Sequence, residues 1–181
     1  DKGNGFYSYA YSVYTILLLL SSYSLPLAVS KMVSAKAQLG QWRNVKRVFI
    51  CAIAFAIGIG TTFGLTVLIG AQFFTRVFFH SELAAIALRF MAPTILIMAL
   101  LGVFRGFFQG LQNTLPTAVS QIVEGLINAI MSVVFAYFLF DFGHGMDAAG
   151  GTTDLGYAWG AAGGAIGTGA GALAGLIFCF I

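Results

Sequence analysis

The sequence predicts an all-α integral membrane protein, and three features of its composition and patterning support that prediction. Of the 181 residues, 59% are hydrophobic and only 8% are charged, whereas soluble domains carry about 25% charged residues. Long runs without any charged side chain alternate with short charged patches. Several of these runs exceed the roughly 18 residues that mark a candidate transmembrane helix.

Five membrane-spanning helices account for the apolar runs. We expect them at about residues 6–33, 44–78, 81–110, 116–140 and 155–181. Most are longer than the roughly 20 residues that cross a hydrocarbon core, so tilt or extension into the headgroup region is expected. The chain has no initiator methionine and stops inside an apolar run, so we expect a fragment of a longer protein.

The first predicted helix, 6–33, contains Pro26 and a row of hydroxyl side chains. Pro26 removes one backbone donor and should kink the helix near Ser22. The hydroxyls recur on one helical face, at Ser8, Ser12, Thr15 and Ser22. That face would line a polar cavity or contact another helix.

The distribution of charge predicts the orientation in the membrane. Basic residues gather between the first two helices, at Lys31, Lys36, Arg43, Lys46 and Arg47. By the positive-inside rule the linker Lys31–Arg47 is cytoplasmic, and it should contact anionic lipids rather than nucleic acid. Three helices separate it from the linker Asp141–Asp154, which has three aspartates and no basic residue. That linker and the N-terminus of the chain are therefore expected outside.

A short turn joins the third and fourth predicted helices. Asn113 or Thr114 can cap a helix whose first turn holds Pro116, where a missing N–H is tolerated. We therefore expect these two helices to form a tight antiparallel hairpin with a cytoplasmic turn.

Glycines at four-residue spacing predict close helix packing, because they let backbones approach in lipid. One row lies in the third helix and two lie in the last: Gly102, Gly106 and Gly110; Gly156, Gly160 and Gly164; Gly163, Gly167, Gly171 and Gly175. The Gly/Ala-rich segment at the end of the chain is accordingly expected to be a helix rather than a linker.

Two ionisable residues, Arg105 and Glu124, lie inside the third and fourth apolar helices, where a charge costs roughly 2.5–3.5 kcal/mol on insertion scales. Each belongs to a one-faced polar stripe with helical spacing: Arg105, Gln109 and Gln112 on the third helix, and Thr117, Gln121, Glu124 and Asn128 on the fourth. Counted from the turn at about 1.5 Å per residue, the two charges lie roughly 12 and 16 Å deep. We therefore expect them at comparable depth on neighbouring helices.

Two interpretations of these polar stripes remain open. In the first, Arg105 and Glu124 form a structural ion pair that lets the hairpin insert. In the second, both stripes face a water-filled cavity, where Arg105 contacts an anionic substrate group and Glu124 is its partner, a cation site or a proton acceptor. The stripes continue over three turns, which is further than one ion pair needs and favours the cavity.

Sequence signatures of soluble enzymes are absent, so we expect no enzymatic activity and no catalytic residues. His80 and His144 fall in linkers, and Cys51 and Cys179 lie in apolar runs without metal-binding spacing. We therefore expect neither a metal site nor a cofactor.

Three segments, GNGFYSYAYSVYTILLLLSSYSLPLAVSKMVS, FRGFFQGLQNTLPTAVSQIVE and GAAGGAIGTGAGALAGL, resemble the polysaccharide-biosynthesis branch of the multidrug/oligosaccharidyl-lipid/polysaccharide exporter superfamily. The resemblance is to its lipid II flippase-like and stage V sporulation protein B-like members. The resemblance implies a transporter of about twelve to fourteen helices in two lobes, which alternately opens a central cavity to either side of the membrane. Residues 1–181 would then be part of the N-terminal lobe, with the remainder of the chain missing.

The resemblance also implies a substrate and a set of cavity residues. The substrates are undecaprenyl-diphosphate-linked cell-wall or surface-polysaccharide precursors such as lipid II, moved across the cell membrane with possible coupling to protons, sodium or the membrane potential. Lys31, Arg105 and Glu124 fall in family-like motifs. One departure is that residues 6–33 contain no arginine, whereas Gram-negative members carry cavity arginines on their first two helices. Diphosphate recognition would then use Lys31, Arg105 or groups outside the fragment.

Other functions are compatible with the same sequence. A cation-coupled multidrug exporter of the same superfamily would be expected to hold more acidic and aromatic groups in its cavity and to lack a phosphate-binding cation. A non-transporting membrane scaffold and a membrane glycolipid transferase are further alternatives. A transferase predicts paired acidic residues near an interface, and the aspartates of the 141–154 linker lack nearby bases.

Overall fold

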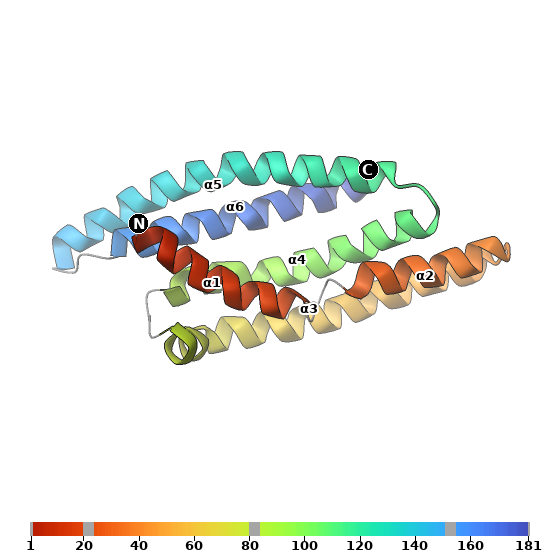
Figure 1. Ribbon diagram of the computed structural model, residues 1–181, viewed down its shortest axis with the longest axis horizontal. Coiled ribbons are helices and arrows are strands. Elements are labelled where there is room, and N and C mark those ends of the chain that lie inside the picture. Colours follow the sequence, from red (N-terminus) through yellow and green to blue (C-terminus); the bar gives the residue numbers. More distant parts are fainter. Residues whose placement is uncertain (1, 20–23, 80–83, 151–154, 181) are drawn as a thin grey trace.

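The computed structural model describes residues 2–19, 24–79, 84–150 and 155–180, which form an elongated bundle of helices (Figure 1). The helices are α1 (Lys2–Leu18), α2 (Ser24–Gln38), α3 (Trp42–Phe79), α4 (Ala84–Gly110), α5 (Leu115–Gly150) and α6 (Leu155–Phe180). Within these described ranges there is no strand, and α3, α4, α5 and α6 each contain a stretch long and apolar enough to cross a membrane. The predicted all-α membrane fold is confirmed.

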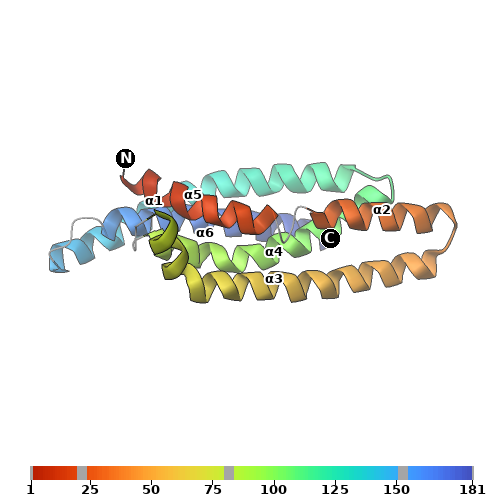
Figure 2. The same cartoon turned by 60° about the horizontal axis from the view of Figure 1, so that its bottom comes forward.

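The first predicted helix, 6–33, corresponds to two helices, α1 and α2, and residues 20–23 between them lie outside the described part of the chain. Pro26 lies in the first turn of α2, where a missing N–H breaks no helical hydrogen bond. The kink expected near Ser22 falls on residues that are not described. The two helices follow one another along one side of the bundle (Figures 1 and 2).

The fourth predicted helix continues further than its apolar run. α5 extends through Asp141 to Gly150, where the sequence predicted the start of an external linker. The extension packs against the beginning of α6, because the Phe142 ring meets Trp159 edge-on and Gly143 lies against Gly156. Because of these contacts residues 141–150 are helical, although their glycines and aspartates indicated a linker.

Helix α4 is the centre of the bundle and contacts each of the other five helices. More than half of its most apolar stretch, 56%, is buried inside the protein, whereas none of the corresponding stretch of α5 is. Leu88, Met91 and Ile95 of α4 form one apolar cluster with Tyr14 and Val67. The apolar clusters of the described residues surround α4, with members from α3 and α6 but none from α5, so α5 is a peripheral helix.

The glycine rows lie at helix contacts, as predicted. A Cβ at Gly163, Gly167 or Gly171 of α6 would collide with the backbone or side chains of α5, at Phe135, Ser132 and Asn128 respectively. On α4, Gly106 and Gly110 lie against α2, at Pro26 and Val33. These rows bring α5 onto α6 and α2 onto α4.

The predicted hairpin of the third and fourth helices is confirmed in its short turn, but the expected close packing of the two helices is wrong. Helices α4 and α5 are joined by the short turn at residues 111–114, in which Gln112 has a φ of 61°. Beyond this turn α5 packs along α6, which lies between α5 and α4 for much of their length (Figure 1). The glycine row of α6 offers α5 a closer surface than α4 does, so the two helices of the hairpin diverge.

Candidate functional site

A polar cavity of about 600 Å³ lies where α4 and α5 diverge, and α2 contributes to one side of it. Five polar side chains line it: Arg105, Gln109, Gln121, Glu124 and Asn128. The remaining lining residues are apolar or small: Pro26, Leu27, Met98, Gly102 and Gly125. The polar stripes of two helices therefore border one space, here called the polar cavity.

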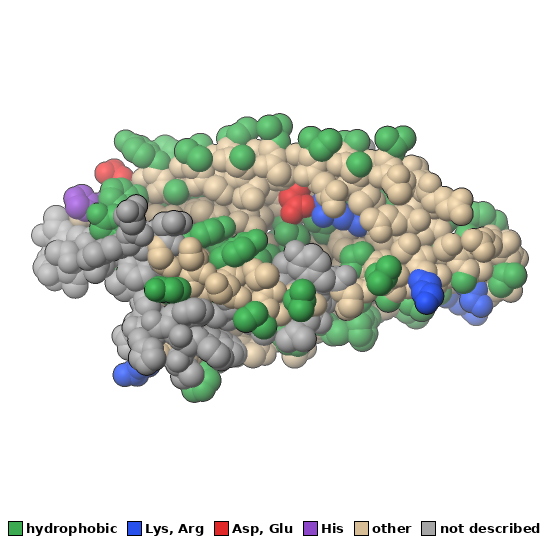
Figure 3. Space-filling model, viewed as in Figure 1, with side chains coloured by type: hydrophobic (Ala, Val, Ile, Leu, Met, Phe, Trp, Pro, Cys, Tyr) green, Lys and Arg blue, Asp and Glu red, His purple; other side chains and the backbone are tan. Residues whose placement is uncertain are grey.

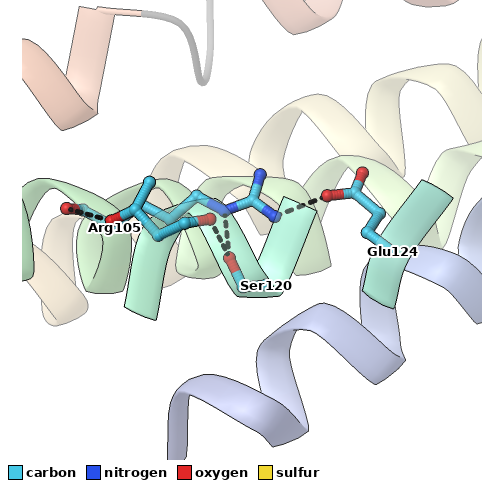
Figure 4. Close-up of polar contacts among 4 residues, drawn as sticks. Arg105, Ser120 and Glu124 are labelled. Carbon is cyan, nitrogen blue, oxygen red and sulfur yellow. Dashed lines mark hydrogen bonds and ion pairs between the residues drawn. The ribbon is translucent and has the colours of Figure 1, made fainter. Parts of the chain in front are cut away.

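An ion pair lies in the wall of this cavity. The Arg105 Nη2 donates to Glu124 Oε2 at 2.6 Å, and the two side chains are 15% and 18% exposed (Figure 4). The predicted comparable depth of the two charges is thereby confirmed. A short charge-assisted hydrogen bond of this kind is about twice as strong as a neutral one.

Ser120 fixes the orientation of the guanidinium, and the sequence reasoning missed it. The Arg105 Nε donates to Ser120 Oγ at 2.9 Å, and that hydroxyl donates to the Thr117 carbonyl at 2.8 Å (Figure 4). Thr117, expected on the polar stripe of α5, is buried, and its hydroxyl lies 3.5 Å from the Arg105 carbonyl. Ser120 comes four residues before Glu124, so the spacing of the stripe could have identified it.

The ion pair leaves the polar cavity without a net charge from these two residues. Glu124 neutralises Arg105, while a guanidinium has five N–H donors and only some of them are used by Glu124 and Ser120. The three amides add donors and acceptors of both kinds. On the face shown in Figure 3, charged side chains lie near the ends of the molecule except for one acidic and basic group at mid-length. The cavity therefore offers hydrogen bonds rather than a strong field.

Two residues predicted for the site lie outside the polar cavity. Gln112 follows the end of α4 at Gly110 and lines a smaller cavity of about 210 Å³, together with Gln38 and Trp42. Helical spacing does not extend to it, because the chain has entered the turn. Lys31 is exposed on α2, one helical turn beyond Leu27, which does line the polar cavity.

The hydroxyl row of α1 does not line the polar cavity either. The Ser12 hydroxyl donates to the Ser8 carbonyl and the Thr15 hydroxyl donates to the Tyr11 carbonyl, both at 2.8 Å. Ser8 and Ser12 are exposed, so they are not packed against another helix. These hydroxyls satisfy themselves on their own backbone, as polar groups in lipid must. Ser22 falls outside the described residues.

The fold and the site define a multi-pass α-helical membrane protein with a polar cavity inside its span. The chain belongs to the polysaccharide biosynthesis protein family, whose profile matches residues 1–181.

Two curated relatives are similar to the chain. It is 25% identical over 182 residues to stage V sporulation protein B of Bacillus subtilis (strain 168), an alignment that covers 100% of this chain and 32% of the relative. It is 26% identical over 136 residues to the lipid II flippase MurJ of the same organism, covering 71% of this chain and 25% of the relative. The chain thus spans about a third or less of the length of these proteins. No solved structure matches.

Proposed function

We propose that this chain is part of the N-terminal lobe of a flippase that moves undecaprenyl-diphosphate-linked cell-wall or surface-polysaccharide precursors, such as lipid II, by alternating access. The observation that carries the proposal is the polar cavity, which lies between helices that are otherwise apolar. The family assignment and the similarity to a protein named as a lipid II flippase support it.

The chemistry of the polar cavity suits a glycan headgroup. Moving hydroxyl and amide groups into hydrocarbon without hydrogen-bond partners costs roughly 2–7 kcal/mol for each group. The side chains of Gln109, Gln121 and Asn128 provide both donors and acceptors for sugar hydroxyls. A volume of about 600 Å³ falls within the roughly 300–1,000 Å³ range of small-molecule sites. The cavity would therefore replace water around the headgroup during passage.

We assign capture of the diphosphate to Lys31 rather than to Arg105. Glu124 already compensates the charge of Arg105, whereas Lys31 is exposed one turn from the polar cavity. An ammonium group is a flexible point charge that binds phosphate oxygens without a fixed geometry. Arg105 would reach a phosphate oxygen only in a state in which its pair with Glu124 has opened.

The proposed orientation follows from the basic residues around the turn between α2 and α3. Lys36, Arg43, Lys46 and Arg47 lie near this turn, so we place it in the cytoplasm. The turn at 111–114 lies at the same end of the bundle (Figure 1), here called the basic end. The N-terminus of the chain is then external, and Lys31 meets the substrate on the cytoplasmic side.

Energy for transport would come from protons or sodium acting at Glu124, or from the membrane potential. A cation that binds Glu124 competes with Arg105 for the same carboxylate, so it would free the guanidinium. The check is to collapse the proton gradient, the sodium gradient and the potential separately in cells. Under this proposal, at least one of these treatments slows the appearance of precursor on the outer face.

The decisive experiment uses the full-length protein in cells. Depleting it should leave lipid-linked precursors inaccessible to a membrane-impermeant probe on the outer face, and restoring it should reverse the effect. Precursors that stay equally accessible after depletion would contradict the flippase. If depletion instead raises drug sensitivity alone, the multidrug exporter becomes the better description.

A further inference from the structure

A second groove, separate from the polar cavity, lies on the outer surface between α3 and α4. Its volume is about 300 Å³, and it shares no lining residue with the polar cavity. Its walls are almost entirely apolar, and the lining residues include Leu65 and Leu68 of α3 and Phe90 and Leu96 of α4. One charged residue, Arg89, lines the groove as well. We call it the Arg89 groove.

Arg89 is exposed and forms no ion pair with an acidic residue among those the structure describes. It belongs to α4, a helix apolar enough to span a membrane. A cation on such a helix either has a partner or reaches the membrane surface, because at the helix centre its insertion costs roughly 2.5–3.5 kcal/mol. Arg105 on the same helix is neutralised by Glu124. Arg89 has no such acidic partner among the described residues, so its charge is available to an anionic group outside the chain.

The position of Arg89 along α4 lets its side chain reach the level of lipid headgroups. A helix of 27 residues is about 40 Å long, which exceeds a hydrocarbon core of about 30 Å by roughly 5 Å at each end. Arg89 lies five residues after the start of α4 at Ala84, or about 7.5 Å along its axis. An arginine there extends its guanidinium to the boundary between acyl chains and headgroups.

The Arg89 groove runs from this boundary toward the membrane interior. Helices α3 and α4 are antiparallel, and close contacts pair Gly64 with Ala92 and Gly60 with Leu96. The lining therefore continues inward from Arg89 for about two helical turns. Gly60 and Gly64 let α3 approach the backbone of α4, and the groove lies along this contact, beside exposed Pro93.

We propose that the Arg89 groove binds a resident membrane phospholipid, with its phosphate at Arg89 and one acyl chain lying between α3 and α4. A cation at the headgroup level and an apolar channel that runs inward are complementary to the two parts of this molecule. Arginine binds phosphate oxygens with two parallel N–H donors, a geometry that lysine lacks. In the proposed orientation the lipid belongs to the outer leaflet. The site depends on α4 crossing the membrane and not on the transported substrate.

The test is native mass spectrometry of the full-length protein, purified in a mild detergent and supplied with phosphatidylglycerol. Wild type should retain one phospholipid per chain. Arg89→Gln removes the charge and Thr61→Trp places a large side chain at an exposed lining position. Each should lower the retained fraction at least tenfold, and Arg89→Lys should lower it less than Arg89→Gln.

The matched control is Thr62→Trp, which places the same large side chain at the next residue of α3, exposed but not among the lining residues of the groove. It should retain lipid as wild type does. Equal retention by Arg89→Gln and wild type would overturn the proposal, as would equal losses in Thr61→Trp and Thr62→Trp. Retention of a polyprenyl phosphate in place of phospholipid would also overturn it, and so would a wild-type protein that retains no lipid. Monodisperse elution of each variant shows that lost lipid is not lost folding.

Discussion

Helix α5 has two neighbours in the fold, and the two contacts differ sharply. Against α6 it packs closely over its length, because Gly163, Gly167 and Gly171 present no side chains to it. Against α4, to which a short turn connects it, it diverges and borders the polar cavity. Four residues separate α5 from each of these two neighbours, 111–114 before it and 151–154 after it. Because α4 and α6 are equally close to α5 in sequence, the comparison teaches that small residues determine which of them packs along α5. Polar residues of α5 lie on the side that faces the polar cavity.

The largest effect is expected where the close contact is broken. Gly167→Leu would drive a side chain into the backbone of Ser132 and separate α6 from α5. We expect loss of folded full-length protein from the membrane, measured by immunoblot and by fluorescence-detected size exclusion. Gly58→Leu is the control, because an added Cβ there meets nothing within 4 Å. Equal yields for the two variants would contradict the packing described.

The next largest effect concerns the ion pair on the open side of α5. Arg105→Gln and Glu124→Gln each remove one partner of a pair that is largely but not completely buried, which costs about 1–3 kcal/mol for the group left behind. We expect both variants to insert, with transport reduced at least tenfold. The double exchange Arg105→Glu with Glu124→Arg should restore stability but not transport. If the double exchange fully restored transport, the pair would have a structural role and no role in binding substrate.

A smaller effect is expected from the serine that orients the guanidinium. Ser120→Ala removes one hydrogen bond to Arg105, worth about 1.5–3 kcal/mol when one partner is charged. Transport should fall several-fold while the protein remains folded. Ser34→Ala is a control on α2, since Ser34 lines the small cavity instead. Wild-type transport by both variants would contradict the role of Ser120 in orienting Arg105.

The smallest effect belongs to the turn that joins α4 and α5. Gln112 has a φ of 61°, a conformation that costs an L-residue roughly 1–2 kcal/mol and costs glycine almost nothing. Gln112→Gly should raise the melting temperature slightly and leave transport unchanged. Gln109→Ala, one turn earlier and inside the polar cavity, should instead lower transport about threefold. A loss of transport in Gln112→Gly would place that residue in the site after all.

Much of the fold follows from the sequence because hydrophobic runs and glycine rows act locally. The predicted ends of the helices at 44–78 and 81–110 lie within three residues of α3 and α4. The sequence alone could not decide between one helix and the two that the structure describes, α1 and α2, because Pro26 is compatible both with a kinked helix and with the first turn of a new one. The extension of α5 depends on contacts with Trp159, which no local pattern reveals.

The candidate site was partly predictable for the same reason. Helical spacing brought Arg105, Glu124 and the amides onto faces that do meet across one space. It could not reveal that this space stays open, because the divergence of α4 and α5 depends on how α6 packs against α5, and helical spacing within one helix does not show which neighbour that helix packs against. The role of Ser120 depends on the direction of the Arg105 side chain, and that direction is a property of the packed structure.

The central claim is that the space between α4 and α5 holds water within the membrane span, and adjacent residues of α5 offer its most direct test. Gln121 lines the polar cavity, whereas Ile122 is 69% exposed and is not among the lining residues. In full-length protein with Cys51 and Cys179 replaced by alanine, single cysteines at these two positions are treated with a membrane-impermeant thiol reagent from each side. We predict that Gln121→Cys reacts at least tenfold faster than Ile122→Cys. Equal rates would contradict the account.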